Sequence, residues 1–118
     1  MDYVKILKYG NIINITFNIE HDKPFNIGEK MNELCEDAYM NGYNWEAFFN
    51  YYLWKNYPEI LEGIDFDPEE GMFTAYYDYS PENEIKAEKF KEIIRDLVEN
   101  EEKLYEVIKV EAAYIEWD

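Results

Sequence analysis

The sequence predicts a single α+β domain in which an antiparallel sheet of two hairpins packs against about four helices. Three observations lead to this class. Strand-like alternation occurs in two separate parts of the chain, helical periodicity occurs in four others, and 118 residues suit one domain. Hydrophobic residues make up 47% of the chain and aromatic residues 19%, which argues for a folded core despite the high charge. No linker, internal repeat or low-complexity segment interrupts residues 1–118.

The first hairpin is expected at the start of the sequence. Apolar and polar side chains alternate from Tyr3 to Tyr9 and again from Ile13 to Ile19. Gly10 and Asn11 stand between the two runs, and both residue types tolerate the positive φ of a tight turn. The pattern predicts two antiparallel strands with one apolar face that needs a cover.

A first helix is expected to provide part of that cover. Asn26 is a candidate N-cap, and Glu29 follows three residues later as in a capping box. The apolar residues at helical spacing are Ile27, Met31, Leu34, Cys35 and Ala38. Cys35 is the only cysteine, so no intramolecular disulfide forms, and its place on this stripe predicts a small core residue.

The second helix contains the densest aromatic cluster. Gly42 marks the break before it, Asn44 is the expected N-cap, and Pro58 limits its end. The stripe predicted to face the core consists of Trp45, Phe48, Phe49, Tyr52 and Leu53. A second stripe consists of Ala47, Tyr51 and Trp54. It leaves two alternatives: the helix is packed between two layers, which is the commoner arrangement, or it presents aromatic side chains to a protein partner.

A second hairpin is predicted between Ile64 and Tyr79. A short strand at Ile64–Phe66 precedes the turn Asp67–Gly71, in which proline fixes φ and glycine relieves it. Alternation resumes from Met72 to Tyr79 and predicts the longer strand of the pair.

Two more helices and a final strand are expected after this hairpin. Ser80 and Pro81 are typical of a helix start, and Asn100 separates a shorter helix from the one that begins there. The apolar positions of the two helices are Ile85, Phe90, Ile93, Ile94 and Leu97, then Leu104, Val107 and Ile108. The tail from Val110 to Trp117 is expected to add an edge strand, protected from further pairing by Glu111, Glu116 and Asp118.

Charge is the strongest compositional signal, because 27 acidic residues against 11 basic ones give a formal net charge of -16. Such a field repels nucleic acid and anionic lipid, so neither is an expected partner. An acidic surface also serves solubility alone. The distribution favours a contact site, because one block contains carboxylates and no Lys or Arg: Glu59, Glu62, Asp65, Asp67, Glu69 and Glu70. No apolar run resembles a signal peptide or a membrane span, which predicts a cytoplasmic location.

Few residues are suited to catalysis. The chain has one His, one Cys, one Ser and one Arg, and Ser80 is already explained as a helix cap. The acids at Asp65, Asp67 and Glu69 resemble the start of a calcium loop, but Pro68 interrupts that pattern and its twelfth position is not Glu. We therefore expect no catalytic residues, no cofactor and no metal. An enzyme that uses only carboxylates or tyrosines is the least favoured interpretation.

Four motifs resemble the immunity protein 51 family of bacterial polymorphic-toxin systems: Asn41–Trp45, Tyr57–Leu61, Ile64–Glu69 and Met72–Tyr76. The resemblance extends less specifically to the first hairpin and to the helix at Ser80, and so covers most of the chain. Asn44 stands where the family motif has aspartate, and either residue can cap a helix. The tail after Val110 is longer than the family pattern.

The resemblance implies a non-enzymatic inhibitor that binds a cognate bacterial toxin, as in contact-dependent inhibition. A toxin that degrades nucleic acid presents a cationic cleft, to which an acidic protein with aromatic anchors is complementary. The expected toxin-binding residues are Glu62, Asp65, Asp67, Glu69 and Glu70, with Tyr76, Tyr77 or Tyr79 adding apolar area. The residues expected to be structural are Gly42, Trp45, Phe66, Pro68 and Phe73. The alternatives are an acidic mimic of nucleic acid, which should display a regular array of carboxylates, or another protein-interaction module.

Overall fold

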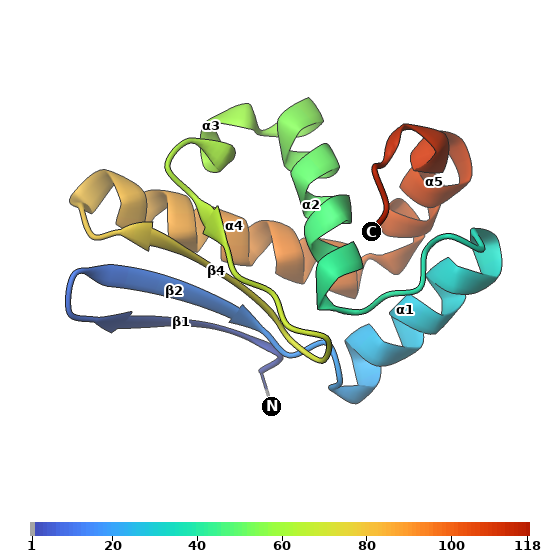
Figure 1. Ribbon diagram of the computed structural model, residues 1–118, viewed down its shortest axis with the longest axis horizontal. Coiled ribbons are helices and arrows are strands. Elements are labelled where there is room, and N and C mark those ends of the chain that lie inside the picture. Colours follow the sequence, from blue (N-terminus) through green and yellow to red (C-terminus); the bar gives the residue numbers. More distant parts are fainter. Residues whose placement is uncertain (1) are drawn as a thin grey trace.

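The computed structural model describes residues 2–118, which form a four-stranded antiparallel sheet and five α-helices (Figure 1). The strands are β1 (Val4–Tyr9), β2 (Ile12–Phe17), β3 (Asp65–Phe66) and β4 (Phe73–Asp78). The helices are α1 (Asp22–Leu34), α2 (Gly42–Asn56), α3 (Pro58–Leu61), α4 (Pro81–Glu99) and α5 (Glu101–Glu111), and a 3-10 helix, η1 (Ala112–Tyr114), follows. The predicted α+β class and both predicted hairpins are confirmed.

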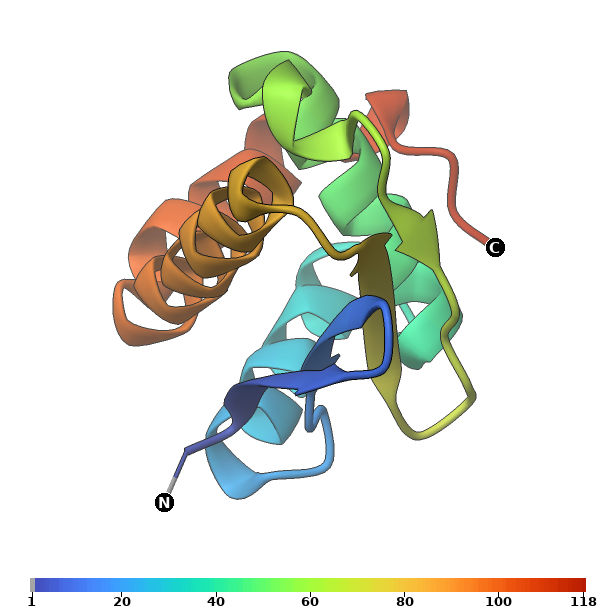
Figure 2. The same ribbon diagram turned by 90° about the vertical axis from the view of Figure 1, so that its left-hand side faces the viewer.

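The helices cover one face of the sheet and leave the other face open (Figure 2). The strand order is β1-β2-β4-β3, so the two hairpins join through β2 and β4. α4 packs against β1 and β2, and α2 packs against β4. The buried side chains of the central strands are those of Ile13, Ile15 and Phe17 on β2 and of Phe73, Ala75 and Tyr77 on β4. Their alternation with partly exposed neighbours is that of a sheet with one solvated face.

An aromatic cluster joins α2 to the sheet. The Phe49 ring lies 5.0 Å from that of Phe73 and 5.3 Å from that of Phe90, between centroids. The Trp45 ring meets Phe17 edge to face at 5.0 Å. The predicted core stripe of α2 is confirmed, since all five of its side chains are buried. Such aromatic pairs stabilise the packing beyond the burial of apolar area, so α2 is firmly held against the sheet.

The beginnings of α1 and α2 differ from the prediction. α1 is capped by His21 rather than Asn26, because Pro24 is accommodated in the first turn, where its missing N–H is not needed. α2 is capped by Asn41, whose Oδ1 accepts the Asn44 N–H at 2.9 Å. Asn44 is therefore inside the helix, and its buried side chain bonds to Tyr39 and Asp118 instead of capping α2.

The predicted C-terminal edge strand is wrong. α5 continues to Glu111 and η1 follows, so the apolar residues around Val110 belong to helical turns. The alternation after residue 113 is real: Ile115 is buried and Trp117 is partly buried, whereas the residues between and after them are exposed. This segment packs beside α2 instead of the sheet, and the Asp118 N–H donates to Asn44 Oδ1 at 2.7 Å.

Four positions of the predicted core stripes are not fully buried: Ile85 and Leu34 are exposed, and Cys35 and Val107 are partly buried. Ile85 was expected on the buried stripe of α4 but is 72% exposed. It lies two residues before the buried Ala87, and residues two apart point to nearly opposite sides of a helix. Cys35 is free and partly buried against the core, at the C-cap of α1.

Candidate functional site

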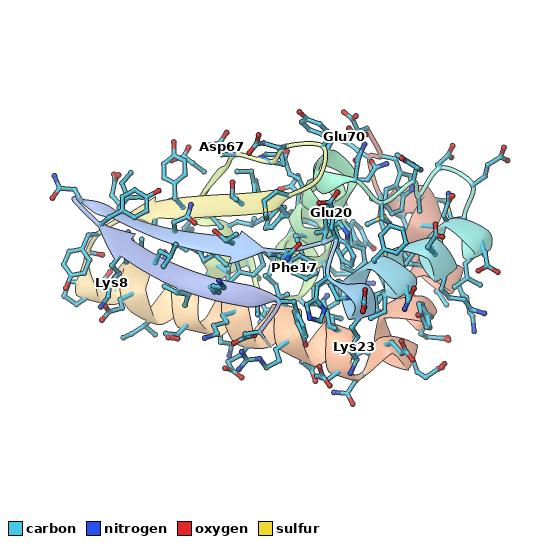
Figure 3. The ribbon with its side chains drawn as sticks, turned by 90° about the horizontal axis from the view of Figure 1, so that it is seen from below. Lys8, Phe17, Glu20, Lys23, Asp67 and Glu70 are labelled. Carbon is cyan, nitrogen blue, oxygen red and sulfur yellow. The ribbon has the colours of Figure 1, made fainter. Side chains whose placement is uncertain are left out.

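Five predicted toxin-binding carboxylates lie together along one side of the molecule, on β3 and the segments that flank it. We call this set the acidic edge; it consists of Glu62, Asp65, Asp67, Glu69 and Glu70, all exposed. Figure 3 shows Asp67 and Glu70 along the same margin, while Lys8 and Lys23 lie toward the β1 and α4 side. The acidic edge therefore faces away from these two cations.

The carboxylates of the acidic edge are largely uncompensated. Within residues 2–118, only Glu62 of this set lies within 4.0 Å of a cation, with 3.9 Å between its Oε2 and Lys86 Nζ. Lys8 and Lys23 are instead paired with carboxylates of α4, Glu84 and Glu99. The distribution of charge within the fold thus leaves one negative margin open to a cationic partner.

The loop of residues 67–71, which presents Glu69 and Glu70 and which we call the acidic loop, is held against the first turn of α2. The Gly42 N–H donates to the Glu70 carbonyl at 3.0 Å, and Asn41 Nδ2 donates to Glu70 Oε2 at 3.3 Å. A Cβ at Gly42 would lie 1.9 Å from the Glu69 carbonyl oxygen and 2.4 Å from that of Met72, so only glycine allows this approach. Gly42 is structural, as predicted, and its role is to fix the acidic loop.

Glu20 adds a carboxylate beside this loop that no motif indicated. It follows β2, and its Oε2 lies 3.0 Å from the position that a Cβ on Gly71 would take. Figure 3 shows Glu20 near Glu70. The two are separated by 50 positions in the sequence, and only the pairing of β2 with β4 brings their neighbourhoods together.

The three predicted tyrosines have different surroundings. Tyr76 lies on the open face of the sheet, cross-strand from Asp65 of the acidic edge. Tyr79 is 52% exposed but follows the opposite end of β4 from the acidic loop, with its N–H bonded to the Asn11 carbonyl at 2.7 Å. Tyr77 is removed from the contact surface, because its side chain is fully buried.

Tyr77 instead joins α3 to the sheet. Its hydroxyl donates to the Ile60 carbonyl at 2.5 Å, and burial raises the pKa of the phenol. Successive side chains of a strand point to opposite faces, so Tyr76 and Tyr77 cannot both reach one surface.

A groove between α2 and the C-terminal segment forms a second concave surface, which we call the α2 groove. Its volume is about 840 Å³, and its lining residues are Tyr43, Glu46, Ala47, Asn50, Tyr51, Trp54, Lys55, Tyr114, Glu116 and Asp118. The second stripe of α2 therefore faces this groove and not a second layer, and Trp54 is 65% exposed. The alternative in which α2 presents aromatic side chains to solvent is the one that the structure adopts.

The α2 groove carries excess negative charge. Its one cation, Lys55, is paired with Glu111, which also accepts the Tyr51 hydroxyl at 2.6 Å. Glu46 has its pKa raised first by burial and then by the nearby Asp118 carboxylate. Within residues 2–118, neither of these two acids has a cation within 4.0 Å.

Residues 2–118 offer neither a three-ligand metal site nor a membrane-spanning helix. This part of the chain contains no group of three His, Cys, Asp or Glu side chains placed to hold a metal ion. None of its helices combines the length and the apolar character needed to cross a membrane. The two candidate binding surfaces are the acidic edge and the α2 groove.

These surfaces and the fold define the class: a small α+β domain with exposed carboxylates and exposed aromatic rings. The comparison with family models is more specific. The model of the immunity protein 51 family matches residues 4–113, and the chain belongs to this family. No curated protein and no solved structure matches the chain. Membership supports a role as an immunity protein with a toxin as its partner, and it suggests a non-enzymatic role.

Proposed function

We propose that this protein is a cytoplasmic bacterial immunity protein that neutralises a cationic toxin of a polymorphic-toxin system, such as a nuclease, by binding it through the acidic edge. Glu62, Asp65, Asp67, Glu69 and Glu70 supply the negative charge, and Tyr76 and Tyr79 add apolar area. The observation that carries the proposal is a row of exposed carboxylates of which four have no cation within 4.0 Å, within residues 2–118.

Electrostatics explains why such a margin suits a nuclease. An enzyme that cleaves nucleic acid must attract phosphate, and it does so with a positively charged cleft. Complementary charge accelerates encounter by about 10- to 1000-fold and disfavours partners of the same sign. An acidic protein placed over that cleft blocks it and uses the same attraction.

The way the acidic loop is held favours tight binding. Association is weakened when loops and side chains must be ordered at the interface. Here the loop is fixed in advance by the Gly42 N–H and by Asn41 Nδ2, which both bond to Glu70. The carboxylates also lie along one margin and not in a regular array, which favours one partner over general mimicry of nucleic acid.

Co-expression with the product of the gene immediately upstream tests the function. Growth should be rescued, and the two proteins should co-purify as a stable complex. Toxicity without rescue or binding, with both proteins expressed, would contradict the immunity role. Co-purification with several unrelated DNA-binding proteins would favour the nucleic-acid mimic.

Charge reversal maps the site. A variant with lysine at Asp65, Asp67, Glu69 and Glu70 should lower the association rate by about 10- to 1000-fold at low salt, and its binding should depend less on salt. The matched control carries four reversals at exposed positions of α1 and α5 that have no cation within 4.0 Å in residues 2–118: Glu29, Glu33, Glu102 and Glu106. Equal losses in the two variants would show that net charge alone matters, and unchanged affinity in the first would refute the site.

A further inference from the structure

We infer that the α2 groove receives an arginine side chain of the toxin, so that the toxin is held at two adjacent surfaces. The identity of the partner rests on the proposed function. The chemistry of the occupant, a guanidinium on a flexible stem, follows from the groove itself.

The lining of the groove is rich in exposed aromatic side chains. Tyr43, Trp54 and Tyr114 are 42%, 65% and 71% exposed, although large aromatic side chains are favourable to bury. The rings of Tyr51 and Trp54 lie 6.3 Å apart at 40°, so they form adjoining faces on one side of α2. Exposed Tyr and Trp are common anchors of interfaces, and a planar guanidinium stacks on such faces.

Charge selects among occupants. Glu46, Glu116 and Asp118 line the groove, while its Lys55 is already neutralised by Glu111. An acidic or neutral side chain would leave the negative charge of these carboxylates uncompensated. A guanidinium would satisfy them through charge-assisted hydrogen bonds while its flat face rests on the rings. The raised pKa of Glu46 fits this interpretation, because a bound cation would relieve the cost of partial burial beside Asp118.

The groove adjoins the acidic edge through the first turn of α2. Gly42 of that turn bonds to the acidic loop at Glu70, and Asn44 of the same turn bonds to the C-terminal segment at Asp118. Tyr43, which lines the groove, lies between them in sequence. Figure 2 shows β3 and the C-terminal segment on the same side of the molecule. One partner can therefore contact both surfaces without reaching around the domain.

One wall of the groove lies outside the family match. The match to the family model ends at residue 113, whereas Tyr114, Glu116 and Asp118 follow it. The match therefore does not account for this wall, and we assign it to the recognition of this chain's own partner.

The test uses a defined probe in place of the toxin. The peptide acetyl-Gly-Arg-Gly-amide is titrated into the protein by NMR, with the citrulline peptide as a neutral isostere. The Trp54 indole N–H and the backbone amides of Glu46 and Ala47 should shift and saturate with the arginine peptide. The citrulline peptide should bind at least about 10-fold more weakly, because its neutral ureido group can form neither an ion pair with the carboxylates nor a cation–π contact with the rings.

Variants locate the binding. Trp54→Ala and Glu46→Gln should each weaken binding by about two- to fivefold. Glu106→Gln, which removes one charge from α5 outside the groove, should have no effect. Trp54 is mostly exposed, so its replacement leaves the core intact. Absence of saturable shifts, or equal affinity for the two peptides, would overturn the inference.

The same variants in the toxin complex identify the occupant. Trp54→Ala and Glu46→Gln should weaken toxin binding, and Glu106→Gln should not. A toxin affinity that both groove variants leave unchanged overturns the inference while the immunity function stands. A protein that binds the arginine peptide but neither binds nor neutralises the toxin overturns the proposed function, and with it the toxin as occupant.

Discussion

Gly42→Ala is the most informative perturbation, because it tests how the acidic loop is attached to the fold. The new Cβ would lie 1.9 Å from the Glu69 carbonyl oxygen, and ordinary contact begins at 3.4 Å, so the two atoms must separate by about 1.5 Å (3.4 − 1.9). The clashing atoms belong to the backbone, so no rotamer change can relieve the contact. The loop must move, and the Gly42 N–H bond to Glu70 is weakened or lost.

The magnitude follows from three contributions. Overpacking costs about 1–3 kcal/mol, and the upper part of this range applies because rigid backbone is displaced. Loss of the hydrogen bond costs about 1 kcal/mol, whereas the smaller freedom of the unfolded chain returns about 0.4–1 kcal/mol. The free energy of unfolding should fall by about 3 kcal/mol, and the melting temperature by about 12 °C for a chain of this size.

Urea and thermal unfolding, followed by circular dichroism, measure this loss. Gly28→Ala is the matched control, because its Cβ would meet only Met40 side-chain atoms, at 3.0 and 3.6 Å. It should lie within about 1 kcal/mol of wild type, since alanine also favours the helix. A stability of Gly42→Ala within about 0.5 kcal/mol of wild type would refute the close approach. At temperatures where the variant is folded, toxin affinity should still fall, because Glu69 and Glu70 are displaced.

Three further predictions concern single side chains. Asn44→Asp should cost about 2–4 kcal/mol at neutral pH, because Nδ2 donates to the Tyr39 carbonyl at 2.8 Å and a carboxylate cannot. Burial raises the folded-state pKa of the introduced carboxyl above its unfolded value. The loss of stability should therefore vanish below about pH 4 and grow as pH rises from there to the folded-state pKa. Urea midpoints that show a pH-independent loss would contradict this. Tyr77→Phe should cost about 1–2 kcal/mol by leaving the Ile60 carbonyl unpaired. Burial also raises the pKa of Tyr77, so wild-type stability should fall above about pH 10, where the unfolded phenol ionises first, and urea midpoints of the variant should fall less steeply. Trp54→Ala should change the free energy of unfolding by less than about 0.5 kcal/mol, because the side chain is 65% exposed. A larger loss, measured by urea unfolding, would place the side chain in the core.

The sheet and the core could be predicted because they depend on local periodicity. Alternation identified both hairpins, and the spacing of Trp45, Phe49 and their neighbours identified the buried side of α2. The caps could not be predicted with the same success, because Asn41 and Asn44 are both good cap residues and only the backbone conformation selects one. For the tail, alternation predicted an extended segment, but which surface it packs against is decided by tertiary contacts such as the Asp118 bond to Asn44.

The candidate surfaces were predictable only in part. The residues of the acidic edge lie close together in the sequence, so the distribution of charge along the chain was enough to group them. The α2 groove has one wall on α2 and the other about 60 positions later, so the exposed stripe indicated a surface without its partner wall. Tyr77 was wrongly included because adjacent strand residues were treated as one patch, although they face opposite sides of the sheet.

The attachment of the C-terminal segment has a consequence for how specificity can evolve. Ile115 secures the segment in the core, and the Asp118 N–H is bonded to Asn44, while the side chains of Tyr114, Glu116 and Asp118 are exposed. If the α2 groove contacts the toxin as we infer, substitutions at these exposed positions would alter recognition with little effect on folding. Partner choice could then change through substitutions at these three positions, while the buried residues of the domain remain constrained by stability.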